Sequence, residues 1–329
     1  MNWLRNWRFW VGVVLSLLLL YVVFYKTNLG EVWAALQQAN YLWLVPAIIV
    51  YLIGVGWRAF RWQYLLDPIK HIPAGRLFPV VVIGYMANDV LPARLGEVVR
   101  AYILGEKEGV SKSATLMTIV VERVVDGLTL VLFILVASFF LPLDVTLSRV
   151  LRLATLLFVG VIVVLFLVAS SRRLADRLVA LVLSPLPEGP RGKIAGISSA
   201  FLDGLGVLRS GWALAWAMLF SVLAWLCETA MYVLVAWGFG LTQPFTLFGL
   251  TCGVGNLAAI VPSTPGYIGP FDAAVKYALV LFGVADGLAT SYTLVLHAAL
   301  LLPPILLGFY YLWREGLSLG EVSRSKFHV

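Results

Sequence analysis

Long apolar segments recur along the whole chain, and this feature most limits what it can fold into. Six of them are long enough to cross a membrane as helices, because a bilayer core of about 30 Å takes about 20 apolar helical residues. Apolar residue types make up 61% of the chain and charged residues 12%, which excludes a soluble globular surface. We therefore predict an all-α, polytopic integral membrane protein. The six predicted spans cover residues 9–25, 41–59, 116–140, 153–170, 212–237 and 287–313.

Two further apolar regions, 77–104 and 245–282, are interrupted by proline and glycine. Backbone that leaves the helix at membrane depth is tolerated only inside protein or beside a watery cavity, because its polar groups need partners. We therefore interpret both regions as re-entrant hairpins. Residues 86–96 align without a gap to 256–266, and each stretch has a proline, three residues and then a glycine. Such paired, broken segments are typical of an inverted repeat around a transporter's binding site.

The repeat gives an expected organisation for the chain. We expect one domain over residues 1–329, with half-repeats of about 41–140 and about 211–313. Three crossings separate the two hairpins, so the first would enter from the cytoplasmic face and the second from outside. An amphipathic cytoplasmic linker of about 172–209 would join the halves.

The basic residues fall mainly on one predicted side of the membrane. With the N-terminus in the cytoplasm, 19 of the 24 lysines and arginines lie in the cytoplasmic segments 1–8, 58–112, 171–210 and 314–329. Cytoplasmic loops of membrane proteins carry such an excess. We therefore predict a multi-pass protein of the cell inner membrane with both termini cytoplasmic. The net charge of +7 follows from this topology, and nucleic acid is not an expected partner.

The two hairpins offer different chemistry. After Pro92 the first resumes as a helix, so Arg94, Glu97 and Arg100, spaced by three, share one face. The helix N-terminus adds N–H donors and partial positive charge, which suits a phosphate. The alternative is that the arginines only reach toward lipid headgroups and that the Pro-Gly pairs form ordinary loops. Besides these three residues, the predicted substrate-binding set contains Asn88 in the first hairpin and Ser263, Thr264, Gly266 and Tyr267 in the second.

Three charged residues stand close together inside the third predicted span: Glu122, Arg123 and Asp126. A central charge costs roughly 2.5–3.5 kcal/mol on insertion scales, so three of them imply partners or a hydrated cavity. Glu122 and Asp126 share a helix face, where they would repel each other without an intervening cation. Arg123, Arg94 and Arg100 are the candidates for that cation. We add the three residues to the binding set; the alternative is an ion cluster that only holds helices together.

Two titratable residues lie near the middle of later spans, Glu228 in the fifth and His297 in the sixth. A lone carboxyl group in a span can carry a coupling proton, because desolvation favours its neutral form. We therefore assign both residues to proton coupling, with a hydrogen-bonded structural Glu and a satisfied core histidine as the alternatives. Asp272 and Lys276, four residues apart, are expected to pair with each other.

Four blocks of the sequence together resemble a known family. They are Arg61-Trp-Gln-Tyr-Leu-Leu66, Asn88-Asp-Val-Leu-Pro-Ala-Arg94-Leu-Gly-Glu97-Val-Val-Arg100, Glu122-Arg-Val-Val-Asp126 and Val261-Pro-Ser-Thr-Pro-Gly-Tyr-Ile-Gly-Pro-Phe271. In this order they look like the lysylphosphatidylglycerol synthase transmembrane, or flippase-like, family. The resemblance implies a membrane domain that moves a charged lipid to the outer leaflet. The bifunctional members carry a soluble aminoacyltransferase domain after the membrane part, so this chain looks like a stand-alone member without the synthetic activity.

From these features we expect a transporter and not an enzyme: a lipid translocase that moves a lipid with a phosphate-containing or otherwise polar headgroup between leaflets. The sequence has no G-x-x-x-x-G-K-[ST] nucleotide-binding motif, so transport would be passive or ion-coupled. We expect no cofactor and no metal. The expected partners are membrane lipids with an anionic or phosphate headgroup, a separate lipid synthase or glycosyltransferase, and further copies of the chain.

Two other functions stay open. Glu97, Glu122 and Asp126 could act as a base or as metal ligands in a membrane enzyme acting on a polyprenyl-phosphate or a glycerophospholipid. Against this, the intermingled arginines would compete with a metal cation. The chain could also be a non-transporting scaffold for a partner synthase in hopanoid, isoprenoid-lipid or glycolipid metabolism.

Overall fold

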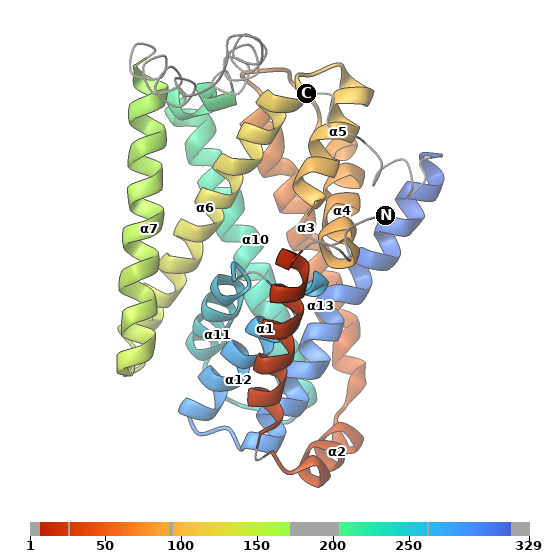
Figure 1. Ribbon diagram of the computed structural model, residues 1–329, viewed down its shortest axis with the longest axis vertical. Coiled ribbons are helices and arrows are strands. Elements are labelled where there is room, and N and C mark those ends of the chain that lie inside the picture. Colours follow the sequence, from red (N-terminus) through yellow and green to blue (C-terminus); the bar gives the residue numbers. More distant parts are fainter. Residues whose placement is uncertain (1–6, 26, 92–94, 172–203, 262, 317–329) are drawn as a thin grey trace.

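The computed structural model describes residues 7–25, 27–91, 95–171, 204–261 and 263–316, and these ranges are helical apart from short connections. Most of the helices lie side by side and run roughly along the long axis of the molecule (Figure 1). In chain order the elements are α1 (Trp7–Phe24), α2 (Leu29–Gln38), η2 (Tyr41–Trp43), α3 (Leu44–Leu66), α4 (Ala74–Val90), α5 (Gly96–Glu108), α6 (Lys112–Ser138), α7 (Val145–Ser170), η4 (Gly204–Arg209), α10 (Gly211–Gly238), α11 (Phe245–Ala258), η5 (Pro265–Tyr267), α12 (Pro270–Leu281) and α13 (Asp286–Arg314).

Three of the long helices begin at side-chain caps. Ser111 accepts a hydrogen bond from the Ala114 N–H at the start of α6, and Ser210 accepts one from the Ala213 N–H at the start of α10. Asp144 caps α7 in the same way, at 2.8 Å from the Leu147 nitrogen. Such caps satisfy N–H groups that have no partner within the helix. The apolar runs in the sequence are therefore bounded by polar residues that fix where each helix starts.

Among the residues that the structure describes, length and composition identify four helices able to cross a membrane: Tyr41–Leu66, Val145–Ser170, Gly211–Gly238 and Asp286–Arg314. A fifth crossing would combine Val13–Phe24 with Leu29–Gln38, two helices that meet at 83°. The third predicted span, which corresponds to α6, is not among them and carries Glu122, Arg123 and Asp126. The all-α, polytopic membrane architecture is thus confirmed, and the number of six crossings stays a prediction.

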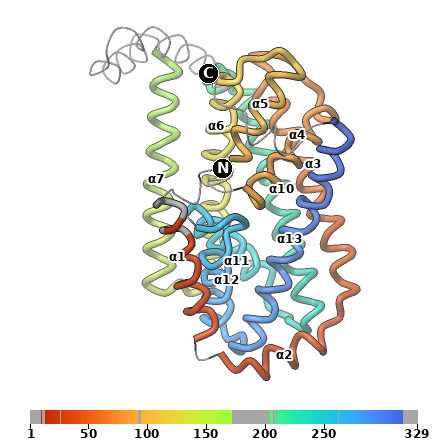
Figure 2. The backbone as a smooth tube through the Cα atoms, turned by 45° about the vertical axis from the view of Figure 1, so that its right-hand side comes forward, coloured from red at the N-terminus to blue at the C-terminus, as the bar shows by residue number. Residues whose placement is uncertain are grey.

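Two helical pairs enter the bundle from opposite ends and break near its middle (Figures 1 and 2). We call α4 with α5 hairpin I, and α11 with α12 hairpin II. The two breaks meet, because a Cβ atom added at Gly266 of η5 would lie 3.8 Å from the backbone oxygen of Asp89. Pro92 and Pro262, which define the predicted repeat, lie outside the described residues. The broken helical pairs are present where the sequence predicted them, whereas their re-entrance into the membrane and the half-repeats 41–140 and 211–313 stay predictions.

Close packing inside hairpin I depends on a missing side chain. A Cβ at Gly96 would lie 2.0 Å from the Gly84 oxygen, so α4 and α5 can cross there only without a side chain at position 96. In hairpin II, Gly269 has a φ of 100° and precedes Pro270, the first residue of α12. The side chain of Asp272 accepts a hydrogen bond of 2.8 Å from the Gly269 N–H. These local features turn the chain back on itself at mid-depth.

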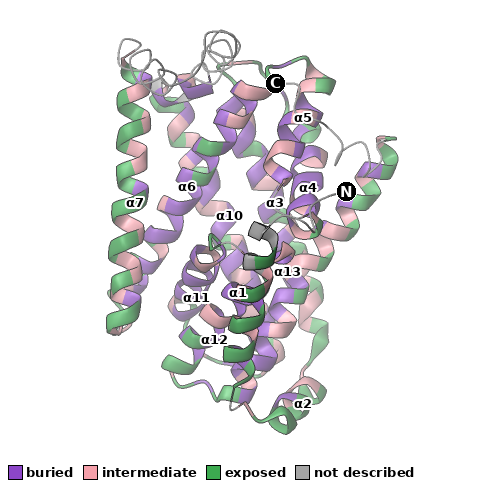
Figure 3. Ribbon diagram, viewed as in Figure 1, coloured by how far each residue is buried: buried purple, intermediate pink, exposed green. Residues whose placement is uncertain are grey.

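Helix α7 lies at the edge of the bundle, and most of its surface is exposed (Figure 3). Of an apolar stretch of 18 residues in α7, only 11% are buried, against 50% in the corresponding stretch of α10. By contrast, α6 beside it buries residues along its whole length. Most of the predicted linker, residues 172–203, lies outside the described residues. The last turn before α10, η4, lies against the start of α6, where a Cβ at Gly204 would be 2.5 Å from the Ala114 oxygen.

Candidate functional site

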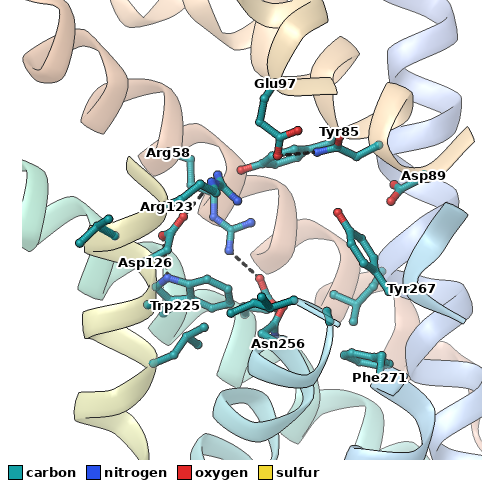
Figure 4. A pocket seen from close by; sticks show the side chains of 18 of the residues that line it. Arg58, Tyr85, Asp89, Glu97, Arg123, Asp126, Trp225, Asn256, Tyr267 and Phe271 are labelled. Carbon is teal, nitrogen blue, oxygen red and sulfur yellow. Dashed lines mark hydrogen bonds and ion pairs between the residues drawn. The ribbon is translucent and has the colours of Figure 1, made fainter. Parts of the chain in front are cut away.

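A cavity of about 540 Å³ lies where the two hairpins meet. It is lined by side chains of both halves of the chain, and those labelled in Figure 4 converge on it from several helices. Ligand pockets of proteins commonly have this volume. The ionisable and amide residues that line it are Arg58, Asn88, Asp89, Glu97, Arg123 and Asp126 from the first half, and Glu228, Asn256 and His297 from the second.

Glu122 of α6 is buried and is surrounded by arginines. Arg100 of hairpin I donates two hydrogen bonds to its carboxylate, of 2.8 and 2.9 Å, and lies with its guanidinium 4.1 Å from the centre of the Trp62 ring. Arg61 of α3 lies 3.2 Å from the same carboxylate, and Arg123 also pairs with it. Neither Arg100 nor Glu122 lines the cavity. Their position is that of an ion cluster between helices, which favours the structural alternative, and a binding role for the two residues stays a prediction.

Asp126 joins this cluster to the cavity. Arg61 donates to both of its carboxylate oxygens, with the Nη2–Oδ2 contact at 3.2 Å, and Trp225 Nε1 donates at 2.8 Å. Arg123 Nη2 lies 3.3 Å from Oδ2. The repulsion expected between Glu122 and Asp126 is therefore relieved by intervening arginines. Arg123 was among the candidates for this role, but Arg61 was missed.

Arg123 differs from the other arginines of the cluster in its exposure. Its side chain is 43% exposed, whereas those of Arg61 and Arg100 are 0% and 2% exposed. It also lines the cavity, and Figure 4 shows it beside Asp126 and Arg58. Arg123 is therefore the member of the cluster best placed to meet a bound molecule. Arg94, the other predicted headgroup contact, lies outside the described residues.

Glu228 is not the isolated carboxyl group that the sequence suggested. Arg58 Nη2 lies 2.7 Å from its Oε2, and Asn256 Nδ2 donates to its Oε1 at 2.9 Å. The Arg58 guanidinium lies 4.6 Å from the centre of the Trp225 ring. This network links α3, α10 and hairpin II along the cavity wall. A proton-coupling role for Glu228 stays a prediction, and its ion pair favours the structural alternative.

His297 of α13 ties down the tip of hairpin II. Its Nδ1 lies 2.7 Å from Asp272 Oδ1, and its Nε2 lies 2.7 Å from the Gly266 carbonyl oxygen. Asp272 therefore binds His297, and the predicted pairing of Asp272 with Lys276 is wrong. Lys276 instead reaches Asp286 at 2.9 Å and Thr27 at 2.7 Å. Asp272 and Lys276 lie on one face of α12, but each of them pairs with a residue of α13.

The remaining predicted residues of hairpin II divide into two groups. Tyr267 lines the cavity and has a φ of 59°, and Figure 4 shows its side chain near Asp89. Ser263 and Thr264 do not line the cavity. The Thr264 N–H donates to Ser16 Oγ of α1 at 3.0 Å, and Ser263 donates to the Thr264 carbonyl oxygen at 3.4 Å. The Thr264 hydroxyl also lies 3.1 Å from Ser16 Oγ, so both residues make contacts that fix the loop, and their predicted role in substrate binding stays a prediction.

Asn88 and Glu97 form the rim of the cavity at hairpin I. Asn88 Oδ1 accepts a hydrogen bond of 2.8 Å from the Gly96 N–H, and its Nδ2 donates to Glu97 Oε1 at 3.2 Å. The amide therefore bridges the two arms of the hairpin and positions the carboxylate. Both residues were predicted, and both line the cavity. Their binding role stays a prediction.

Several cavity residues were not predicted from the sequence: Arg58, Tyr85, Trp225 and Asn256. Arg58 stands three residues before Arg61 at the end of a predicted span, and charge at that depth was read as part of the cytoplasmic excess. The aromatic residues have no such signal, because aromatic side chains are frequent throughout this chain. Within the described ranges, no group of three or more His, Cys, Asp and Glu side chains is arranged to hold a metal ion.

Comparisons with known proteins agree with this architecture. The family model described as the lysylphosphatidylglycerol synthase TM region matches residues 9–308. A UPF0104 membrane protein of Methanothermobacter thermautotrophicus is 23% identical, over 81% of this chain and 83% of the relative. A second UPF0104 membrane protein of that organism is 25% identical, over 85% and 86%. Glycosyltransferase AglD of Haloferax volcanii is 29% identical over 80% of this chain but only 47% of its own length. No solved structure gives a significant match.

Proposed function

The chain belongs to the lysylphosphatidylglycerol synthase TM-region family, and from this membership and the cavity we propose that it is a lipid translocase. It would move a lipid with a phosphate-containing or otherwise polar headgroup between the leaflets of the cell inner membrane, with both of its termini in the cytoplasm. The observation that carries the proposal is the position of the cavity. It lies between two hairpin tips that enter from opposite ends, so it is placed where a headgroup would pass from one side to the other.

The cavity wall supplies the charges that a headgroup needs at this depth. A polar headgroup in hydrocarbon loses its water, and only protein groups can replace that hydration. Arg123 offers guanidinium N–H donors, which form strong, charge-assisted hydrogen bonds with phosphate oxygens. Asp89 and Glu97, which also line the cavity (Figure 4), offer acceptors for hydroxyl or amine groups. A phosphate-containing headgroup with further polar groups fits this set.

Transport would be passive or would be coupled to the movement of a proton. The contact of His297 with Asp272 supports a proton site, because His297 lines the cavity and the geometry of the pair requires protons. The Gly266 carbonyl is an acceptor only, so Nε2 must donate to it. The 2.7 Å contact between Nδ1 and Asp272 then needs a second proton, on the ring or on the carboxyl group.

A second candidate function is support of an enzyme of lipid or glycolipid metabolism. The relative AglD, named as a glycosyltransferase, extends well beyond the part that this chain matches. We propose as the alternative that this chain is a scaffold for a separate synthase or glycosyltransferase that acts on a polyprenyl-phosphate or a related lipid. A catalytic role for Glu122 and Asp126 is less favoured, since arginine donors already occupy both carboxylates.

Reconstitution separates these candidates. Purified protein is placed in vesicles of bacterial total polar lipid extract that contain a trace of headgroup-labelled phosphatidylglycerol, and the label accessible from outside is followed with time. A translocase exposes label from the inner leaflet faster than protein-free vesicles do. A scaffold gives the protein-free rate, and an enzyme converts the labelled lipid into a new product that mass spectrometry detects.

A further inference from the structure

The lining of the cavity is apolar on the side that faces α7. Helix α7 contributes only Leu157, Phe158 and Val161 to the lining, and the adjoining α6 residues include Gly127 and Leu130. The ionisable groups come from α3, hairpin I, α10, α13 and the neighbouring face of α6. The cavity therefore joins a polar region to a hydrocarbon-like one. A lipid has the same division between its headgroup and its chains.

On this apolar side the cavity reaches the outer surface of the bundle. Leu157 lines the cavity although 54% of the residue is exposed. Ile260, at the tip of hairpin II, also lines the cavity and is 50% exposed. Side chains that border a cavity and are also half exposed outside mark an opening in its wall. In a membrane this opening leads into lipid, because α7 presents an apolar surface on every exposed side at this depth.

One face of α7 packs against the bundle beside the opening. The buried residues of α7 are Leu147, Phe158 and Ala169, which lie on one stripe because eleven residues make about three helical turns. A Cβ at Gly127 of α6 would lie 2.0 Å from the Phe158 ring, so the ring fills the space that this glycine leaves. Phe158 thus stands between the cavity and the surrounding lipid.

We propose that the opening between α7 and the tip of hairpin II binds a hydrocarbon chain of the lipid whose headgroup occupies the cavity. The inference rests on the proposed function and adds the place where the chain leaves the protein. A headgroup that crosses inside the bundle stays covalently joined to its chains, and the chains remain in hydrocarbon because exposing them to water or to charged groups is unfavourable. Of the described cavity walls, the α7 side offers apolar lining that continues to the outer surface.

A photo-crosslinking experiment with a matched control tests this assignment. The photoreactive residue p-benzoylphenylalanine replaces Leu157 in one protein and Leu156 in the other. Leu156 is the preceding residue of α7, is 72% exposed and does not line the cavity. Both proteins are reconstituted in vesicles of bacterial total polar lipid extract and irradiated, and the crosslinked lipids are identified by mass spectrometry. Val161 and Leu153 give a second pair of the same kind, should one substitution reduce the yield of folded protein.

The two positions should capture different lipids. At Leu157 we expect one headgroup class to be enriched severalfold over its share of the vesicle, whereas Leu156 should capture lipids in proportion to the vesicle composition. Replacing Arg123 by Ala should remove the enrichment at Leu157, because the headgroup would lose its contact. Equal lipid profiles at Leu157 and Leu156 would overturn the inference, and so would an enrichment that is unchanged in the Arg123→Ala background.

The wild-type transport assay on the same vesicles keeps the two proposals apart. Lipid movement combined with equal crosslink profiles would refute the hydrocarbon site and leave the translocase intact. Absence of movement of the labelled phosphatidylglycerol would refute the proposed function, and the inference with it.

Discussion

Arg61 of α3 and Asp126 of α6 form a buried ion pair that joins two helices in the middle of the bundle, with Nη2 at 3.2 Å from Oδ2. Ser221 and Trp225 of α10 donate to the same carboxylate, so three helices meet at one charged group. A buried charge is stable only when its partners are all present. The arrangement explains how a chain with so little charge can keep several ionised groups at membrane depth.

Removing the Arg61 side chain should therefore destabilise the fold more than removing the side chain of an exposed arginine does. Arg61→Ala leaves Glu122 and Asp126 without one of their cations, and breaking such a buried pair costs about 3–5 kcal/mol. The measurement is thermal unfolding in detergent, followed by size-exclusion chromatography. Arg152→Ala is the control, because Arg152 is exposed on α7 and its Nε bonds only to its own helix. Equal unfolding temperatures for the two variants would contradict the ion cluster.

Gly96→Ala should open or destabilise hairpin I. The added Cβ would lie 2.0 Å from the Gly84 backbone oxygen, which cannot move aside as a flexible side chain could. Overpacking of this kind costs typically about 1–3 kcal/mol. The control is Gly75→Ala at the start of α4, where nothing lies within 4 Å of the added atom. Limited proteolysis and unfolding temperature report the difference, and a Gly96→Ala protein that behaves like the control would refute the close crossing.

His297→Leu should loosen the tip of hairpin II. The substitution leaves the Gly266 carbonyl and one Asp272 oxygen without their partner, and each orphaned buried group costs about 1–3 kcal/mol. Hydrogen exchange should therefore rise selectively over residues 263–272. His297→Gln, which can still donate to one of these acceptors, should give a smaller change. Unchanged exchange in both variants would show that the histidine does not hold the tip.

At the charged end of hairpin I, a pH dependence is expected. A hydrogen bond from Lys70 lowers the pKa of Glu108 below its ordinary value, and Arg76 adds to the effect. A carboxyl group with a lowered pKa in the folded state stabilises the protein above its ordinary pKa and loses that contribution as pH falls through the lowered value. Lys70→Met should therefore reduce stability near neutral pH by less than about 1 kcal/mol, since the pair is exposed. The difference from wild type should shrink in acid to the part due to the Lys70 hydrogen bond with the Glu108 carbonyl oxygen, and a constant difference between pH 7 and pH 3 would contradict the assignment.

The sequence was sufficient for the architecture because apolar runs and proline-glycine breaks follow directly from bilayer thickness and backbone hydrogen bonding. It also located Asn88, Glu97, Arg123, Asp126, Tyr267 and His297, all of which line the cavity. Partners across helices were harder to predict. Arg61 to Asp126, Arg58 to Glu228 and Asp272 to His297 join residues far apart in the chain, and spacing within one helix carries no information about them. For the same reason Asp272 and Lys276, neighbours on one helix, were paired wrongly.

The central claim is that Arg123 contacts the headgroup inside the cavity, and its most direct test is the transport rate of a variant that lacks this contact. Wild type, Arg123→Ala, Arg123→Lys and the Arg152→Ala control are reconstituted at equal density in the vesicles with labelled phosphatidylglycerol, after chromatography shows that each is folded. Loss of charge-assisted hydrogen bonds should slow Arg123→Ala by roughly ten- to a hundredfold. Arg123→Lys should be intermediate, and Arg152→Ala should match wild type. A folded Arg123→Ala protein that moves the lipid at the wild-type rate would contradict the claim.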